Sequence, residues 1–150
     1  MSGEQAERDR HWLELACDLA RLCPPSRTAF SVGAVIVGAD GTELSRGFSR
    51  ESDPKAHAEE AALAKPMEPA DLGGATIYSS LEPCGRRLSR PRPCARLIVD
   101  AGIGRVVYAW REPSLFVEGD GEEVLRAAGI EVVWIGDLAE RAREPNAHLL

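Results

Sequence analysis

Apolar side chains near the start of the chain recur every three or four positions, as they do on one face of a helix. This pattern runs from Trp12 to Leu22 and predicts a helix from about Glu7 to Leu22. Pro24 and Pro25 end it, because proline cannot continue a helix.

Short apolar segments then alternate with helical ones. The turn at Ala39-Asp40-Gly41 joins the first two strands into an antiparallel hairpin. Helices separate the last three strands, so right-handed crossovers should make those strands parallel. The sequence therefore predicts an α/β fold, a mixed five-stranded sheet with helices on both faces. The expected strands are 31–37, 43–48, 75–80, 105–110 and 131–135, and the expected later helices are 57–65, 94–101, 122–128 and 137–149.

Composition limits what kind of protein this is. A chain of 150 residues with 44% apolar content suits one domain spanning residues 1–150. The polar first residues lack the apolar core of a signal peptide, and no segment approaches the apolar length of a membrane span, so we expect a soluble cytoplasmic protein. A net charge of -6 and a pI near 5.1 argue against nonspecific nucleic-acid binding, which depends on cationic side chains.

The segments His57-Ala58-Glu59, Pro83-Cys84 and Pro93-Cys94 supply one imidazole and two thiols. Together these side chains fill three positions of a tetrahedral zinc site and leave the fourth for water, whose pKa the metal lowers toward neutrality. Glu59 is then free to move protons rather than bind the metal. We therefore predict His57, Cys84 and Cys94 as zinc ligands and Glu59 as the catalytic acid and base.

Two other interpretations of these residues remain open. Each cysteine could be an isolated buried thiol, with the histidine merely starting a helix. Alternatively, zinc could be a folding staple, which needs a fourth protein ligand. Cys17 or Cys23 would be the most plausible fourth ligand, although without an export signal both are expected to be reduced and packed near the first helix.

Positive charge concentrates between the two metal-binding cysteines and just after them. The arginines could simply keep a proline-rich loop soluble, or Arg90 and Arg92 could clamp a substrate phosphate. The basic residues in question are Arg86, Arg87, Arg90, Arg92 and Arg96.

Aromatic residues near strand ends offer contacts for a flat heterocycle. Phe30 could lay its ring against such a substrate, or it could be ordinary core. Trp110, Arg111 and Phe116 could close the other side of the pocket, although aromatic residues at strand ends more often pack than bind.

With these motifs in place, the chain resembles the cytidine deaminase superfamily from about Trp12 to Val133. The pairing of H-x-E with a P-C-x-x-C segment, stretched here between Cys84 and Cys94, is the signature of zinc nucleobase deaminases. The flanking segments are most similar to the pyrimidine deaminase domain of riboflavin biosynthesis. Those segments are 32–37, 81–84, 93–95, 101–107 and 125–132.

This resemblance implies a three-layer α/β/α sandwich and an assembly of two or more copies. It also implies zinc bound by His57, Cys84 and Cys94, proton transfer by Glu59, and a backbone contact to substrate near Ala58. The riboflavin enzymes usually carry Asn-Pro ahead of Val-Gly, where this chain has Ala29-Phe30. Phe30-Ser31-Val32-Gly33 is instead similar to the cytidine and deoxycytidylate branches.

The leading functional hypothesis is a zinc-dependent hydrolase that removes ammonia from an aminopyrimidine or a related nucleoside or nucleotide. A riboflavin-pathway diaminopyrimidine phosphate is the first candidate substrate, and cytidine or deoxycytidylate is the second. A zinc-stabilised module that binds a nucleotide without turning it over is the alternative of another class. A nucleic-acid editing enzyme is disfavoured by the overall charge.

Overall fold

A five-stranded mixed sheet forms the centre of the computed structural model, which describes residues 3–68, 72–84, 93–111 and 121–150. Its strand order is β2-β1-β3-β4-β5. β1 pairs antiparallel with both β2 and β3, whereas β3, β4 and β5 run parallel, so the predicted hairpin and crossovers are confirmed. The strands are β1 (Gly33–Val37), β2 (Glu43–Phe48), β3 (Thr76–Leu81), β4 (Arg105–Trp110) and β5 (Glu131–Trp134).

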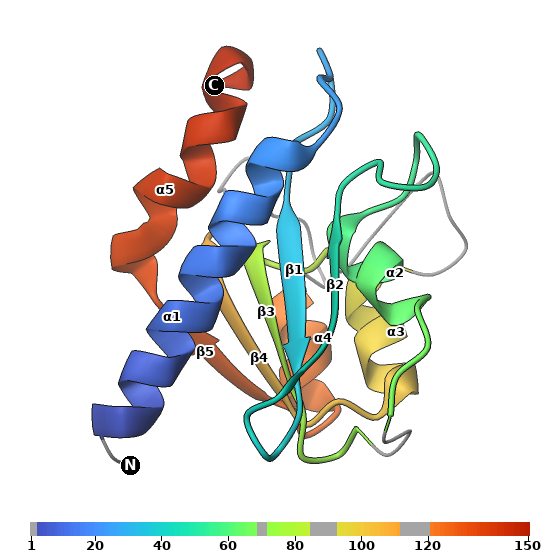
Figure 1. Ribbon diagram of the computed structural model, residues 1–150, viewed down its shortest axis with the longest axis vertical. Coiled ribbons are helices and arrows are strands. Elements are labelled where there is room, and N and C mark those ends of the chain that lie inside the picture. The colour runs from blue at the N-terminus through green and yellow to red at the C-terminus, as the bar shows by residue number, and fades with distance from the viewer. Residues whose placement is uncertain (1–2, 69–71, 85–92, 112–120) are drawn as a thin grey trace.

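Helices cover both faces of this sheet (Figure 1). α1 (Gly3–Leu19) and α5 (Ala139–Arg143) pack on one face. The other face carries α2 (Ala58–Leu63), α3 (Cys94–Ala101) and α4 (Gly121–Ala127). The predicted α/β/α layering is therefore confirmed.

Alternating side chains of the central strands fill the two cores. Ala34 and Ile36 of β1 pack toward α2 and α3, whereas Val35 and Val37 pack toward α1. All residues of β1 are buried, which explains why this strand reads as a continuous apolar segment rather than an alternating one. The site-bearing helices are thus fixed to a strand buried on both sides.

The ends of the chain differ from the sequence prediction. α1 begins at Gly3 rather than near Glu7. Apolar spacing did not reveal its first turns because they are polar. The expected terminal helix is divided into η3 (Gly136–Leu138), α5 and η4 (Glu144–Leu149). Pro145 accounts for the change from α5 to η4, since it lacks the N–H that an α-helix needs. In the described segments, no helix combines the length and the apolar character needed to cross a membrane.

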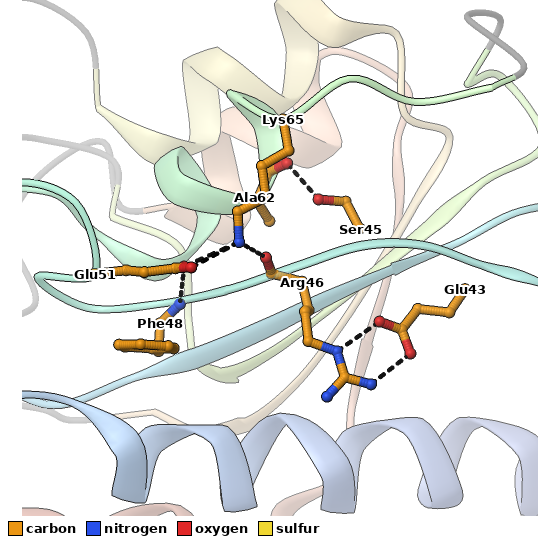
Figure 2. Close-up of polar contacts among 7 residues, drawn as sticks. All are labelled: Glu43, Ser45, Arg46, Phe48, Glu51, Ala62 and Lys65. Carbon is orange, nitrogen blue, oxygen red and sulfur yellow. Dashed lines mark hydrogen bonds and ion pairs between the residues drawn. The ribbon is translucent and has the colours of Figure 1, made fainter.

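β2 holds α2 in place through close backbone packing and polar contacts. A side chain at Gly47 would meet backbone atoms of α2, so only glycine allows this approach. Ser45 donates a hydrogen bond to the carbonyl of Ala62 at 2.7 Å, and Lys65 reaches both Arg46 and Glu51 (Figure 2). These contacts fix the helix that carries Glu59.

A buried carboxylate on α1 joins that helix to β3 and β4. Asp9 is 2% exposed and accepts hydrogen bonds from Arg105 at 2.7 and 2.6 Å and from Tyr78 at 2.8 Å. Burial by itself would raise the pKa of Asp9, but the bonds from Arg105 and Tyr78 outweigh it and hold this pKa below its ordinary value of 3.8.

Replacing Asp9 with alanine should lower the free energy of unfolding by about 3 kcal/mol, because Arg105 and the Tyr78 hydroxyl would lose their buried acceptor, and Arg105 would keep only its longer ion pair with the exposed Glu131. The matched control is Asp18→Ala. Asp18 lies on the same helix as Asp9 but forms an exposed ion pair, with Arg141 of α5, so its loss should cost at most about 1 kcal/mol. Urea unfolding at neutral pH measures both values. Equal losses would contradict the prediction.

The same pair sets a pH dependence. Because the folded pKa of Asp9 lies below the unfolded one, its contribution is complete above the unfolded value of 3.8 and is lost as pH falls through the lower folded value. Unfolding curves between pH 6 and pH 3 should therefore show a smaller gap between wild type and Asp9→Ala at the acidic end.

Candidate metal centre and active site

The predicted ligands and Glu59 come from three elements that meet at the carboxyl end of β3. His57 is the N-cap of α2, one residue before the helix rather than within its first turn as predicted, and Glu59 follows in that turn. Cys84 lies in irregular chain after β3, while Cys94 begins α3 as predicted. The end of a parallel strand is where α/β folds place ligands.

The three predicted ligand atoms lie close together. The Nδ1 atom of His57 is 3.6 Å from the Sγ atom of Cys84 and 3.3 Å from that of Cys94. All three ligand atoms lie within 4.8 Å of one another. The three sequence segments that supply the predicted ligands are therefore close together in the structure.

These separations fit a shared zinc ion. Zn–S bonds of about 2.3 Å and Zn–N bonds of about 2.0–2.1 Å at tetrahedral angles would put sulfur and nitrogen about 3.6 Å apart. The observed sulfur-to-nitrogen distances of 3.3 and 3.6 Å match that value closely. One imidazole and two thiols are also a ligand set that zinc prefers.

The surroundings favour the thiolate form of Cys84. A hydrogen bond from Cys94 and contacts with His57 lower the pKa of Cys84 to about 4, although burial opposes this shift. The backbone N–H of Cys94, at the start of α3, donates to the Cys84 sulfur at 3.3 Å. A deprotonated sulfur is the form that binds metal.

No fourth protein ligand joins this group among the described residues, where His57, Cys84 and Cys94 alone form the cluster. Cys17 is a buried residue of α1 in the core between that helix and the sheet, and the Cys23 thiol lies 3.5 Å from the carbonyl of Val32. The interpretation of these two cysteines as ligands of a closed structural site is therefore wrong. A three-ligand group with an open position is typical of catalytic zinc.

Glu59 lies beside the ligands without belonging to their cluster. It is 4% exposed, and its Oε2 atom is 3.0 Å from the hydroxyl of Ser79 on β3. Burial raises the pKa of Glu59, although His57 and Ser79 act in the opposite direction. A buried carboxyl with a raised pKa suits a group that takes up and releases protons.

Glu82 and Gly121 hold the Cys84 segment against α4. The Oε2 atom of Glu82 accepts a hydrogen bond from the backbone N–H of Glu122 at 2.8 Å. A side chain at Gly121 would come within 1.6 Å of the Pro83 carbonyl oxygen, so the two backbones are in direct contact. In the sequence, Glu82 lies within the segment 81–84, and its position next to Pro83-Cys84 is the one local signal for this role.

The predicted substrate-binding residues are only partly described. Ala58 is fully buried at the first position of α2, next to His57. Trp110 is 3% exposed and belongs to the core. Phe30 is half-buried and packs edge-on against Trp110 with ring centroids 4.9 Å apart. Arg111 lies near Glu82 and over the ring of Trp134. Arg90, Arg92 and Phe116 lie outside the described residues.

Two residues that the sequence analysis did not single out hold the segment that carries Phe30. The guanidinium of Arg50 donates to the carbonyls of Pro24 and Phe30 and to the Ser31 hydroxyl. Asn146, fully buried near the C-terminus, bonds both the N–H and the carbonyl of Ser31. Arg50 has a φ of 61°, a left-handed conformation uncommon outside glycine.

Comparisons with known proteins agree with this geometry. Residues 6–110 match the family model described as the cytidine and deoxycytidylate deaminase zinc-binding region. The chain belongs to this family of zinc-binding deaminase domains, and it shares the cytidine deaminase-like α/β fold.

Relatives within this family include proteins of riboflavin biosynthesis. The diaminohydroxyphosphoribosylamino-pyrimidine deaminase of Schizosaccharomyces pombe is 45% identical over 79% of this chain and 30% of its own length. The structure of Acinetobacter baumannii RibD has a TM-score of 0.81 at 34% identity, covering 95% of this chain and 39% of that one. Aspergillus oryzae Rib2 deaminase in complex with DARIPP has a TM-score of 0.70 at 26% identity, covering 95% and 98%. The chain thus spans about a third of the length of the curated relatives that it matches.

Proposed function

We propose that this chain is a zinc-dependent hydrolytic deaminase that releases ammonia from an aminopyrimidine or a related nucleoside or nucleotide. The observation that carries the proposal is the three-ligand cluster of His57, Cys84 and Cys94 beside a buried carboxyl that does not belong to it. A structural site would have no use for Glu59 in that position.

The chain's own residues have distinct tasks in this reaction. His57, Cys84 and Cys94 would hold the zinc, which when bound supplies a Lewis acid that activates water near neutral pH. Glu59 takes a proton from the attacking water, passes it to the ring nitrogen, and later delivers a proton to the departing amine. One C–O bond forms and one C–N bond breaks, so one water is consumed and one ammonia leaves. A backbone contact to the substrate near Ala58, next to His57, is part of the proposal.

A riboflavin-pathway diaminopyrimidine phosphate is the favoured substrate. The relative from Schizosaccharomyces pombe carries the name of that activity, and the Aspergillus oryzae deaminase was solved with DARIPP. Identity to the first is 45% over most of this chain, which supports a related substrate here.

Cytidine or deoxycytidylate is the second candidate. It is favoured by Ala29-Phe30, which replaces the Asn-Pro pair usual in riboflavin enzymes and removes a polar side chain ahead of β1. The ring of Phe30 is half-buried against Trp110, so the chain ahead of β1 presents an aromatic ring and no side-chain amide.

Ammonia release from the zinc-loaded protein tests the proposal directly. The panel should contain a diaminopyrimidine ribosyl phosphate, cytidine and deoxycytidylate. We expect turnover of the first, while turnover of the other two alone would replace the favoured substrate by the second candidate. A ligand that raises the melting temperature while no ammonia forms from any compound would support a nucleotide-binding module instead.

Arg90 and Arg92 are proposed to bind the substrate phosphate. Replacing Arg92 with alanine should then raise KM for the phosphorylated substrate about 10-fold or more, since a charge-assisted bond is worth roughly 1.5–3 kcal/mol. KM for the dephosphorylated compound should change little. Arg96→Ala provides a control with the same loss of charge, because Arg96 lies in α3, two residues after Cys94, rather than in the loop between the two cysteines. Equal effects on both substrates would remove the clamp from the proposal.

The remaining parts of the proposal come from the sequence. We propose that residues 1–150 act as one catalytic domain in a cytoplasmic homodimer or larger homo-oligomer. A small molecule rather than nucleic acid is the expected partner, because the chain has a net charge of -6. Sedimentation at several protein concentrations measures the oligomeric state.

A further inference from the structure

Ser79 places a hydroxyl on the face of β3 that packs apolar side chains against α2 and α3. Neighbouring positions of β3 face opposite sides of the sheet, so Ile77 packs toward α2 and α3 while Tyr78 packs toward α1. Ser79 shares the side of Ile77 and Leu81 and is fully buried. Burying a hydroxyl costs free energy unless it finds a partner, so its contacts explain its presence.

The hydroxyl of Ser79 lies between two oxygen atoms. It is 3.0 Å from the Oε2 atom of Glu59 and 2.7 Å from the carbonyl oxygen of Leu81. A serine hydroxyl has a single proton, so it cannot donate to both atoms at once. It either donates to Glu59, or it donates to Leu81 and accepts a hydrogen bond from a Glu59 that carries a proton.

This arrangement suits a carboxyl that gains and loses a proton during one reaction. A backbone N–H could only donate and a carbonyl could only accept, whereas a rotating hydroxyl does either. Ser79 therefore keeps a bond to the same oxygen of Glu59 before and after each proton transfer. The carboxyl group keeps its orientation toward the metal ligands without a compensating movement of α2.

We infer that Ser79 is a positioning residue for Glu59: its hydroxyl, 3.0 Å from the Oε2 atom of Glu59 and 2.7 Å from the Leu81 carbonyl oxygen, holds the carboxyl in one orientation beside the metal ligands. The inference rests on the proposed deaminase function and adds a residue to its machinery. A purely structural role, in which Ser79 only satisfies the carbonyl of its own strand, would predict a loss of stability without a specific loss of turnover.

Ser79→Ala tests the inference. We expect kcat to fall about 10- to 100-fold, the range for a misplaced reacting group, while KM stays within about twofold and zinc content stays at one per chain. In the Glu59→Gln background the same substitution should cause no further loss of kcat, because no proton-carrying carboxyl is left to orient.

Ser80 provides a matched control. It is the next residue of β3, is 1% exposed, and accepts a hydrogen bond from the Gly33 N–H at 3.1 Å, with no contact to Glu59. Ser80→Ala should lower the melting temperature as much as Ser79→Ala does, yet leave kcat within about twofold of wild type.

The outcomes separate this inference from the proposed function. Wild-type turnover in Ser79→Ala, an equal further loss in the Glu59→Gln background, or an equal loss in Ser80→Ala would overturn the positioning role alone. A wild-type protein that releases no ammonia from any compound would overturn the proposed function and the inference with it.

Discussion

Glu59→Gln is expected to lower turnover by about 10²- to 10⁴-fold while the protein keeps its fold and its zinc. Glutamine has nearly the same size and can still bond to Ser79, but it cannot carry a proton. Because burial raises the pKa of Glu59, a neutral side chain should be tolerated there without loss of stability. Single-turnover ammonia release, together with metal content and the melting temperature, measures all three expectations.

Glu60→Gln is the control for this substitution. Glu60 is the next residue of α2 and loses the same charge, and its Oε1 atom accepts the N–H of His57, which a glutamine oxygen can also do. Turnover should stay within a few-fold of wild type. Wild-type turnover in Glu59→Gln, or equal losses in both variants, would remove Glu59 from the chemistry.

Gly121→Ala is expected to weaken zinc binding about 10- to 100-fold, the effect typical of residues that support metal ligands. A methyl group at Gly121 would lie 1.6 Å from the Pro83 carbonyl oxygen, so α4 or the Pro83-Cys84 segment has to move. Displacing that segment moves the Cys84 sulfur away from His57 and Cys94. Competition with a coloured chelator measures the affinity.

Gly3→Ala separates this effect from glycine replacement in general. A side chain at Gly3 meets nothing within 4 Å, so zinc affinity should be unchanged in that variant. Circular dichroism shows whether each variant retains its secondary structure. Unaltered zinc affinity in a folded Gly121→Ala protein would refute the view that Gly121 positions Cys84.

Apolar patterning predicted the sheet and its layers well, for identifiable reasons. Strands such as 33–37 and 105–110 are buried on both faces, so their apolar segments are continuous and unmistakable. The pattern was wrong where polar residues form helix, as at the start of α1. It also missed the break at Pro145, because the apolar spacing continues across that proline.

The residues of the candidate site that belong to short sequence motifs could be predicted from the sequence. His57 and Glu59 are two positions apart, and Cys84 follows a strand end, so motifs reveal them. Ser79, Arg50 and Asn146 act through partners far along the chain, which only the register of β3 and the packing of the C-terminal segment bring near. A pair of serines inside the apolar strand 76–81 was the one local signal for Ser79.

Asn146 has a consequence for how the protein is made. Its two bonds to Ser31 join positions that are 115 residues apart. The chain ahead of β1 therefore completes its hydrogen bonds only after residue 146 has left the ribosome, whereas contacts among earlier elements can form before that. A nascent chain paused before Asn146 would carry all three metal ligands, while the N–H and the carbonyl of Ser31, next to Phe30, would still lack their Asn146 partner.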